Sequence, residues 1–149
     1  MFKRIENNIN FAENEDKISN YWSDIDAFQQ SLDKRKESKI FRFYDGPPFP
    51  TGSPHYGNLL AGVIKDIVPR YWTMRGYFVE RRFGWDVHGL PIEMEVQKEL
   101  GLEDPQDIDD YGIDKFNEAC RSQVQTNTEN WERITRKIGR WVDFENDYK

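Results

Sequence analysis

His55 and Asn58 are the side chains best placed for chemistry, because they stand between a loop rich in proline and glycine and an expected helix. The loop, residues 45–58, reads Asp-Gly-Pro-Pro-Phe-Pro-Thr-Gly-Ser-Pro-His-Tyr-Gly-Asn. Its prolines fix φ and remove backbone donors, so it can neither pair as a strand nor continue as a helix. Its glycines let the backbone approach a ligand closely. The first turn of a helix has unpaired N–H groups and a dipole that favours anions, so the sequence predicts a polyphosphate site.

A second loop, residues 84–91, contains Asp86 and His88 and follows another expected strand. The alternating, aromatic and β-branched run 39–44 predicts the first strand, and 77–83 predicts the second. Between them, apolar residues at helical spacing predict a helix that bends at Pro69 and ends at Gly76. Strand, helix and strand form a right-handed unit of a parallel, doubly wound sheet. Ligands bind beyond the carboxyl ends of such strands, so we expect Asp86 to face His55 across one cleft.

The remaining segments predict mostly helix. Residues 1–38 are expected to form a helical lead-in, and residues 92–100 a helix closed by Gly101. Residues 103–112 are an acidic connector rich in turn formers, and apolar residues from 113 to 141 recur at the spacing of one long amphipathic helix. The expected fold class is therefore α/β. It comprises the first half of a doubly wound, Rossmann-type sheet over residues 39–149, a helical lead-in and a long C-terminal helix.

Composition narrows the classes of protein further. The chain has 149 residues, 37% hydrophobic residues and a net charge of −6, so as a whole it does not match nucleic acid electrostatically. Cys120 is the single cysteine, which excludes a disulfide framework and a cysteine-based zinc site. No apolar run approaches the ~20 residues that span a membrane. These features predict a cytoplasmic protein without a protein-bound metal, and a mean hydropathy of −0.89 is low enough to suggest part of a larger protein.

The pattern Pro-x-x-x-Gly-x-x-His-x-Gly-Asn resembles the first signature of class I aminoacyl-tRNA synthetases. The blocks Phe43-Tyr-Asp-Gly-Pro-Pro48 and Gly84-Trp-Asp-Val-His-Gly-Leu-Pro-Ile-Glu93 resemble isoleucyl-tRNA synthetases in particular. The resemblance runs from about Trp22 to the end of the chain. One position departs from the family pattern, because the signature usually ends in a second histidine where this chain has Asn58.

The resemblance implies ATP-dependent activation of isoleucine, with Mg²⁺ accompanying ATP, and transfer to tRNA(Ile). His55 and Asn58 are then the catalytic donors to the phosphates, and Gly57 lets adenine lie flat on the backbone. Asp86 would pair with the ammonium group of isoleucine. The full set of implied ATP-binding residues is Pro48, Phe49, Thr51, His55, Gly57 and Asn58. The implied amino-acid-binding residues are Gly46, whose carbonyl helps Asp86, Pro47 in the apolar wall, Trp85 behind it, Asp86 and His88.

Several alternatives remain open at this stage. Phe49 could serve packing alone, Asp86 could cap a turn, and His88 could orient Asp86 or cap the following helix. The Lys-rich second signature loop, the editing insertion and the second half of the catalytic fold are not recognisable in the chain, so we expect a truncated synthetase whose partner is the rest of its own chain. A non-catalytic remnant or paralogue that binds ATP or aminoacyl-adenylate is the alternative. Another nucleotidylyltransferase fits less well, since such enzymes need no ammonium-binding aspartate at position 86.

Overall fold

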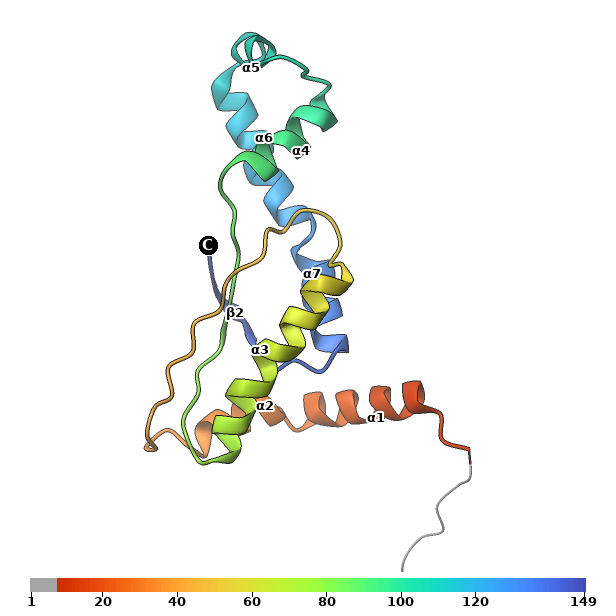
Figure 1. Cartoon of the computed structure of the whole chain (residues 1–149), viewed down its shortest axis with the longest axis vertical. Helices are drawn as coiled ribbons and strands as arrows, with labels where there is room; N and C mark the ends of the chain where they lie inside the picture. The colour runs from red at the N-terminus through yellow and green to blue at the C-terminus, as the bar shows by residue number, and fades with distance from the viewer. Residues whose placement is uncertain (1–7) are drawn as a thin grey trace, which may run out of the picture.

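The computed structural model describes residues 8–149, apart from the side chains of residues 125 and 126. Residues 1–7 of the expected lead-in lie outside this description. The described chain is elongated and mostly helical, with α4, α5 and α6 at one end and α1 and α2 toward the other (Figure 1). In chain order its elements are α1 (Phe11–Asp24), α2 (Ala27–Asp33), α3 (Tyr56–Met74), β1 (Arg82–Gly84), α4 (Leu90–Leu100), α5 (Pro105–Tyr111), α6 (Ile113–Thr126), α7 (Thr128–Lys137) and β2 (Asp143–Tyr148).

The sheet in the described residues is small and parallel. β1 pairs with β2, with Arg82 opposite Asp143 and Gly84 opposite Tyr148. The expected strands 39–44 and 77–83 meet at a single parallel bridge, between Ile40 and Phe78. Parallel pairing across α3 is thus present, but strand geometry in 77–83 is limited to its last two residues, and the doubly wound sheet is not confirmed.

One continuous helix over residues 113–141 is wrong. The helix divides at Asn127 into α6 and α7, and α7 ends at Lys137. Gly139 then adopts φ +72°, a left-handed conformation that turns the chain back. The chain continues into β2, a strand that the sequence analysis did not predict. The acidic connector 103–112 likewise contains a short helix, α5, which begins with a capping box at Asp104.

Other helices match their predictions. The lead-in is helical over α1 and α2, and α4 ends at Gly101 in the expected left-handed conformation with φ +69°. α3 runs through Pro69 without interruption and ends at Met74, two residues before Gly76.

Two clusters form the buried core. The first lies beside β1 and β2 and comprises Phe83, Trp85, Trp131 and Val142. The second joins α4 to α6 and comprises Ile92, Val96, Phe116 and Val124. α3 differs, since its apolar stripe lies exposed within the described structure. The exposed members of that stripe are Tyr56, Leu60, Val63, Ile64, Ile67, Val68, Tyr71 and Met74.

Candidate active site at the start of helix α3

His55 is the N-cap residue of α3 and forms a capping box with Asn58. The Gly57 N–H donates to Nδ1 of His55 at 3.0 Å, and the His55 N–H donates to Oδ1 of Asn58 at 3.0 Å. Because Nδ1 of His55 is an acceptor, the neutral ring carries its proton on Nε2. Each side chain therefore uses one atom to cap the helix and keeps a nitrogen donor, Nε2 of His55 and Nδ2 of Asn58.

Gly57 is required by this cap. A Cβ at position 57 would lie 2.9 Å from Cε1 of His55, closer than carbon atoms pack. Any larger residue at Gly57 would therefore displace the imidazole ring. Gly57 is exposed at the first turn of α3.

The loop of residues 84–91 is joined directly to the loop of residues 45–58. The Asp86 N–H donates to the Pro48 carbonyl at 2.9 Å, so the loop after β1 touches the loop before α3. Trp85, the residue before Asp86, is buried at 3% exposure. Its Nε1–H donates to Oδ2 of Asp147 at 2.7 Å, which fixes the chain next to this junction. The two loops, 38 residues apart at their contact, therefore meet in the fold, and the expectation that Asp86 faces His55 across one cleft stays a prediction.

Helix α7 holds the middle of the 45–58 loop. The Trp131 Nε1–H donates to the Gly52 carbonyl at 3.0 Å, and Nδ2 of Asn130 donates to Oγ of Ser53 at 2.9 Å. Pro50 is fully buried, and Phe49 packs against the second core cluster. Thr51 is half-buried between these anchors. Phe49 thus has a packing role, which the sequence left open beside its expected contact with ATP.

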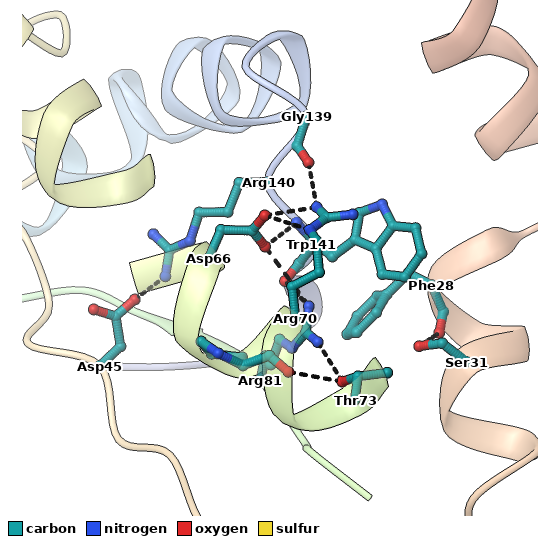
Figure 2. A network of polar contacts seen from close by, with 11 residues as sticks. Phe28, Ser31, Asp45, Asp66, Arg70, Thr73, Arg81, Gly139, Arg140 and Trp141 are labelled. Carbon is teal, nitrogen blue, oxygen red and sulfur yellow. Dashed lines mark hydrogen bonds and ion pairs between the residues drawn. The ribbon is translucent and has the colours of Figure 1, made fainter. Parts of the chain in front are cut away.

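Asp45, at the start of the same loop, is an ionic hub with a side chain 2% exposed. Its Oδ1 lies 2.6 Å from Nζ of Lys65 on α3. Its Oδ2 pairs with Arg140 beyond α7, as Figure 2 shows. Lys65 also donates from Nζ to the Gly46 carbonyl at 2.7 Å. The hydroxyl of Tyr148 on β2 donates to the Asp45 carbonyl at 3.0 Å. Three separate elements therefore clamp the chain immediately before Pro47.

A second acid, Asp66, whose side chain is 13% exposed, continues this network (Figure 2). Its carboxylate pairs with Arg70 at 2.6 Å and Arg81 at 3.6 Å, and accepts the Trp141 N–H at 3.1 Å. Arg81 is 3% exposed, and burial lowers its pKa to about 10 although the Asp66 charge opposes this change. Its guanidinium, which also donates to Thr73 at 2.6 Å, remains charged at neutral pH. The network ties α3 to the segment that links α7 to β2.

His88 lies apart from the contacts described so far between the two loops. It is exposed and lines a separate cavity of about 470 Å³ between α4 and α6, together with Ile92, Cys120 and Val124. Burial raises the pKa of the Cys120 thiol, and the nearby Glu93 charge raises it further.

Among residues 8–149, no three or more His, Cys, Asp or Glu side chains are grouped to hold a metal ion. None of the helices over the same range is both long enough and apolar enough to cross a membrane.

Sequence reasoning missed four residues that support the site: Asp45, Lys65, Trp131 and Arg140. Only Asp45 carried a signal, because it directly precedes the Gly46–Pro47 wall. Lys65 and Arg140 looked like ordinary surface cations on helices, and Trp131 like one member of an apolar stripe.

Residues 17–149 match the family described as tRNA synthetases class I (I, L, M and V). The chain belongs to this family. Its fold is also similar to the crystal structure of the ternary complex of Agrobacterium radiobacter K84 agnB2 LeuRS-tRNA-LeuAMS, with a TM-score of 0.64. That similarity covers 90% of this chain and 15% of the other, at 20% sequence identity, and so concerns the fold alone.

The curated relatives show which class I synthetases the chain resembles, since those named here are isoleucine–tRNA ligases. The chain is 51% identical over 149 residues to isoleucine–tRNA ligase of Treponema denticola, 52% over 139 residues to the cytoplasmic isoleucine–tRNA ligase of Saccharomyces cerevisiae, and 54% over 140 residues to isoleucine–tRNA ligase of Mycobacterium leprae. These matches cover 100%, 93% and 94% of the chain but only 14%, 13% and 13% of the relatives. The resemblance to isoleucyl-tRNA synthetases is confirmed, for a segment about one seventh of their length.

Proposed function

We propose that this chain forms the first part of the active site of an isoleucine–tRNA ligase, which activates isoleucine with ATP and transfers it to tRNA(Ile). The observation that carries the proposal is the hydrogen bond between the Asp86 N–H and the Pro48 carbonyl at 2.9 Å. It joins the loop that would bind the amino acid to the loop that would bind ATP. In this assignment, residues 39–149 belong to the nucleotide-binding catalytic domain.

The proposed reaction is attack of the isoleucine carboxylate on the α-phosphorus of MgATP, with release of pyrophosphate. Such transfers depend mostly on alignment and on neutralising the charge that develops. His55 and Asn58 supply the donors, because their capping box leaves Nε2 of His55 and Nδ2 of Asn58 available at a helix N-terminus. Pro48, Phe49 and Thr51 complete the ATP side, and Gly57 accepts the adenine.

Asp86 would bind the substrate ammonium with help from the Gly46 carbonyl, and Pro47 would line the pocket for the isoleucine side chain. Buried Trp85 supports that wall. His88 is exposed and lines the cavity between α4 and α6, so it is the member of this set with the least support. The rest of the ligase chain and tRNA(Ile) are the proposed partners. The cytoplasm is the proposed location, and the names of the Saccharomyces cerevisiae and Caenorhabditis elegans relatives include the word cytoplasmic.

The proposal is tested in a chimera in which this chain replaces the matching segment of the Treponema denticola relative, which aligns with all 149 residues. Isoleucine-dependent exchange of pyrophosphate into ATP is the readout, and a His55→Ala chimera controls for contaminating host enzyme. Exchange above that control supports the ligase. A chimera that binds ATP without exchange would instead support a non-catalytic relative.

A further inference from the structure

Lys65 connects Gly46, which belongs to the amino-acid site of the proposed function, to α3, whose N-terminus forms the proposed phosphate site. Its Nζ donates to the Gly46 carbonyl at 2.7 Å while lying 2.6 Å from Oδ1 of Asp45. The Gly46 carbonyl belongs to the amino-acid site of the proposed function, and Lys65 has no role in that site so far. The same ammonium group thus holds the backbone oxygen that would receive the substrate.

The Asp45 carboxylate lies between Lys65 and Arg140 and offsets part of the positive charge beside the Gly46 carbonyl. The Asp45 carboxylate is 2% exposed and divides its two oxygens between Lys65 and Arg140. The Lys65 side chain is 29% exposed, so its ammonium is held at the margin of the interior. Arg140, 8% exposed, secures the other oxygen and keeps the carboxylate from turning toward solvent (Figure 2).

A carbonyl oxygen has two lone pairs, and Lys65 uses one of them at Gly46. We propose that Lys65 is a positioning residue for amino-acid binding, which fixes the Gly46 carbonyl so that its second lone pair meets the ammonium group of the substrate. This inference rests on the proposed function. Lys65 itself acts through Gly46 and does not contact the reacting atoms.

The position of Lys65 on α3 gives this contact a second consequence. His55 and Asn58 cap the start of α3, and Lys65 lies in its third turn. The N-terminal end of α3 therefore carries the hydrogen-bond donors to the phosphates, and its third turn carries Lys65, which holds the Gly46 carbonyl. A shift of α3 would move the ATP side and the amino-acid side of the site together. The isoleucine carboxylate would then stay aligned with the α-phosphorus of ATP.

The test is Lys65→Met in the Treponema denticola chimera, with separate titrations of isoleucine and ATP in the exchange assay. We expect the KM for isoleucine to rise about tenfold to a hundredfold, the scale for misplacing a binding group by about 1 Å. The KM for ATP should stay within about twofold, as should both values in the control Lys17→Met, which removes an exposed cation paired with Glu13.

A selective rise in the KM for isoleucine supports the positioning role, whereas equal changes in both KM values, or no change, overturn it. KM does not depend on the folded fraction, so partial destabilisation leaves this comparison valid. If Lys65→Met yields no folded protein, Lys65→Arg decides, because it keeps a positive charge on Asp45 but replaces the bridging ammonium by a planar fork. An unchanged KM for isoleucine in Lys65→Arg then overturns the inference. An unsubstituted chimera without exchange overturns the proposed function, and this inference with it.

Discussion

Asp45→Asn should destabilise the chain strongly, because it removes the charge on which two cations converge. The Asp45 side chain is 2% exposed, and Arg140, one of its partners, is 8% exposed. Removing one partner of a buried ion pair costs about 3–5 kcal/mol, since the other charge stays buried and uncompensated. In a chain of this size each kcal/mol lowers the midpoint of thermal unfolding by about 2–4 °C. The expected loss is therefore about 6–20 °C.

The assay is thermal unfolding of the 149-residue chain followed by circular dichroism at 222 nm, at several protein concentrations because α3 exposes an apolar stripe. Asp33→Asn is the matched control: it removes an exposed carboxylate paired with Lys36, and such pairs contribute little. Arg140→Met should destabilise more than Lys65→Met, because Lys65 is 29% exposed. If Asp45→Asn unfolded at the same temperature as Asp33→Asn, the ionic hub would contribute nothing and the reasoning would be refuted.

Three further results are expected. In the chimera, His55→Ala should lower the rate of exchange by about 10²–10³ with little change in the KM for isoleucine. Asn58→His should be tolerated. If Asn58→His abolished exchange and His55→Ala did not, Asn58 rather than His55 would be the main donor to the phosphates. Asp86→Asn should raise the KM for isoleucine roughly tenfold to 150-fold, from the loss of one charged hydrogen-bond partner, and an equal change for ATP would make Asp86 structural. Cys120, whose raised pKa leaves less thiolate at pH 8, should react with iodoacetamide more slowly than free cysteine, and a rate at or above that of free cysteine would contradict the burial of its thiol.

The sequence predicted helices best where local signals ended them. Gly101 closes α4 as expected, because a left-handed C-cap is a property of the residue itself. The break at Asn127 was missed because apolar residues keep helical spacing on both sides of it, from Phe116 to Trp131. β2 was missed for the opposite reason. Its residues, Asp-Phe-Glu-Asn-Asp-Tyr, are mostly poor strand formers, so its extended form depends on pairing with β1.

Topology alone predicted part of the arrangement around the site. Loops that follow neighbouring parallel strands meet at one edge, and the hydrogen bond between Asp86 and Pro48 joins the two loops. The expectation that Asp86 faces His55 across one cleft stays a prediction. The support for these loops could not be read in the same way. Asp45 is one of 27 acidic residues, and nothing in the local sequence says that it alone would be paired with both Lys65 and Arg140. Burial of a charge is a property of distant segments packed together.

The fit of Tyr148 against Gly84 has a consequence for the order in which the chain folds. A Cβ at Gly84 would lie 2.3 Å from Cζ of Tyr148, so only glycine leaves room for this ring. The same Tyr148 reaches Asp45 across 103 positions of sequence. A ribosome adds about 5–20 residues per second, so roughly 5–20 s pass between synthesis of the first loop and arrival of the tyrosine that clamps it. For most of that interval the nascent loop has neither Arg140 nor Tyr148 and is open to chaperones and proteases. The 45–58 loop is thus made about 100 residues before the tyrosine that secures it.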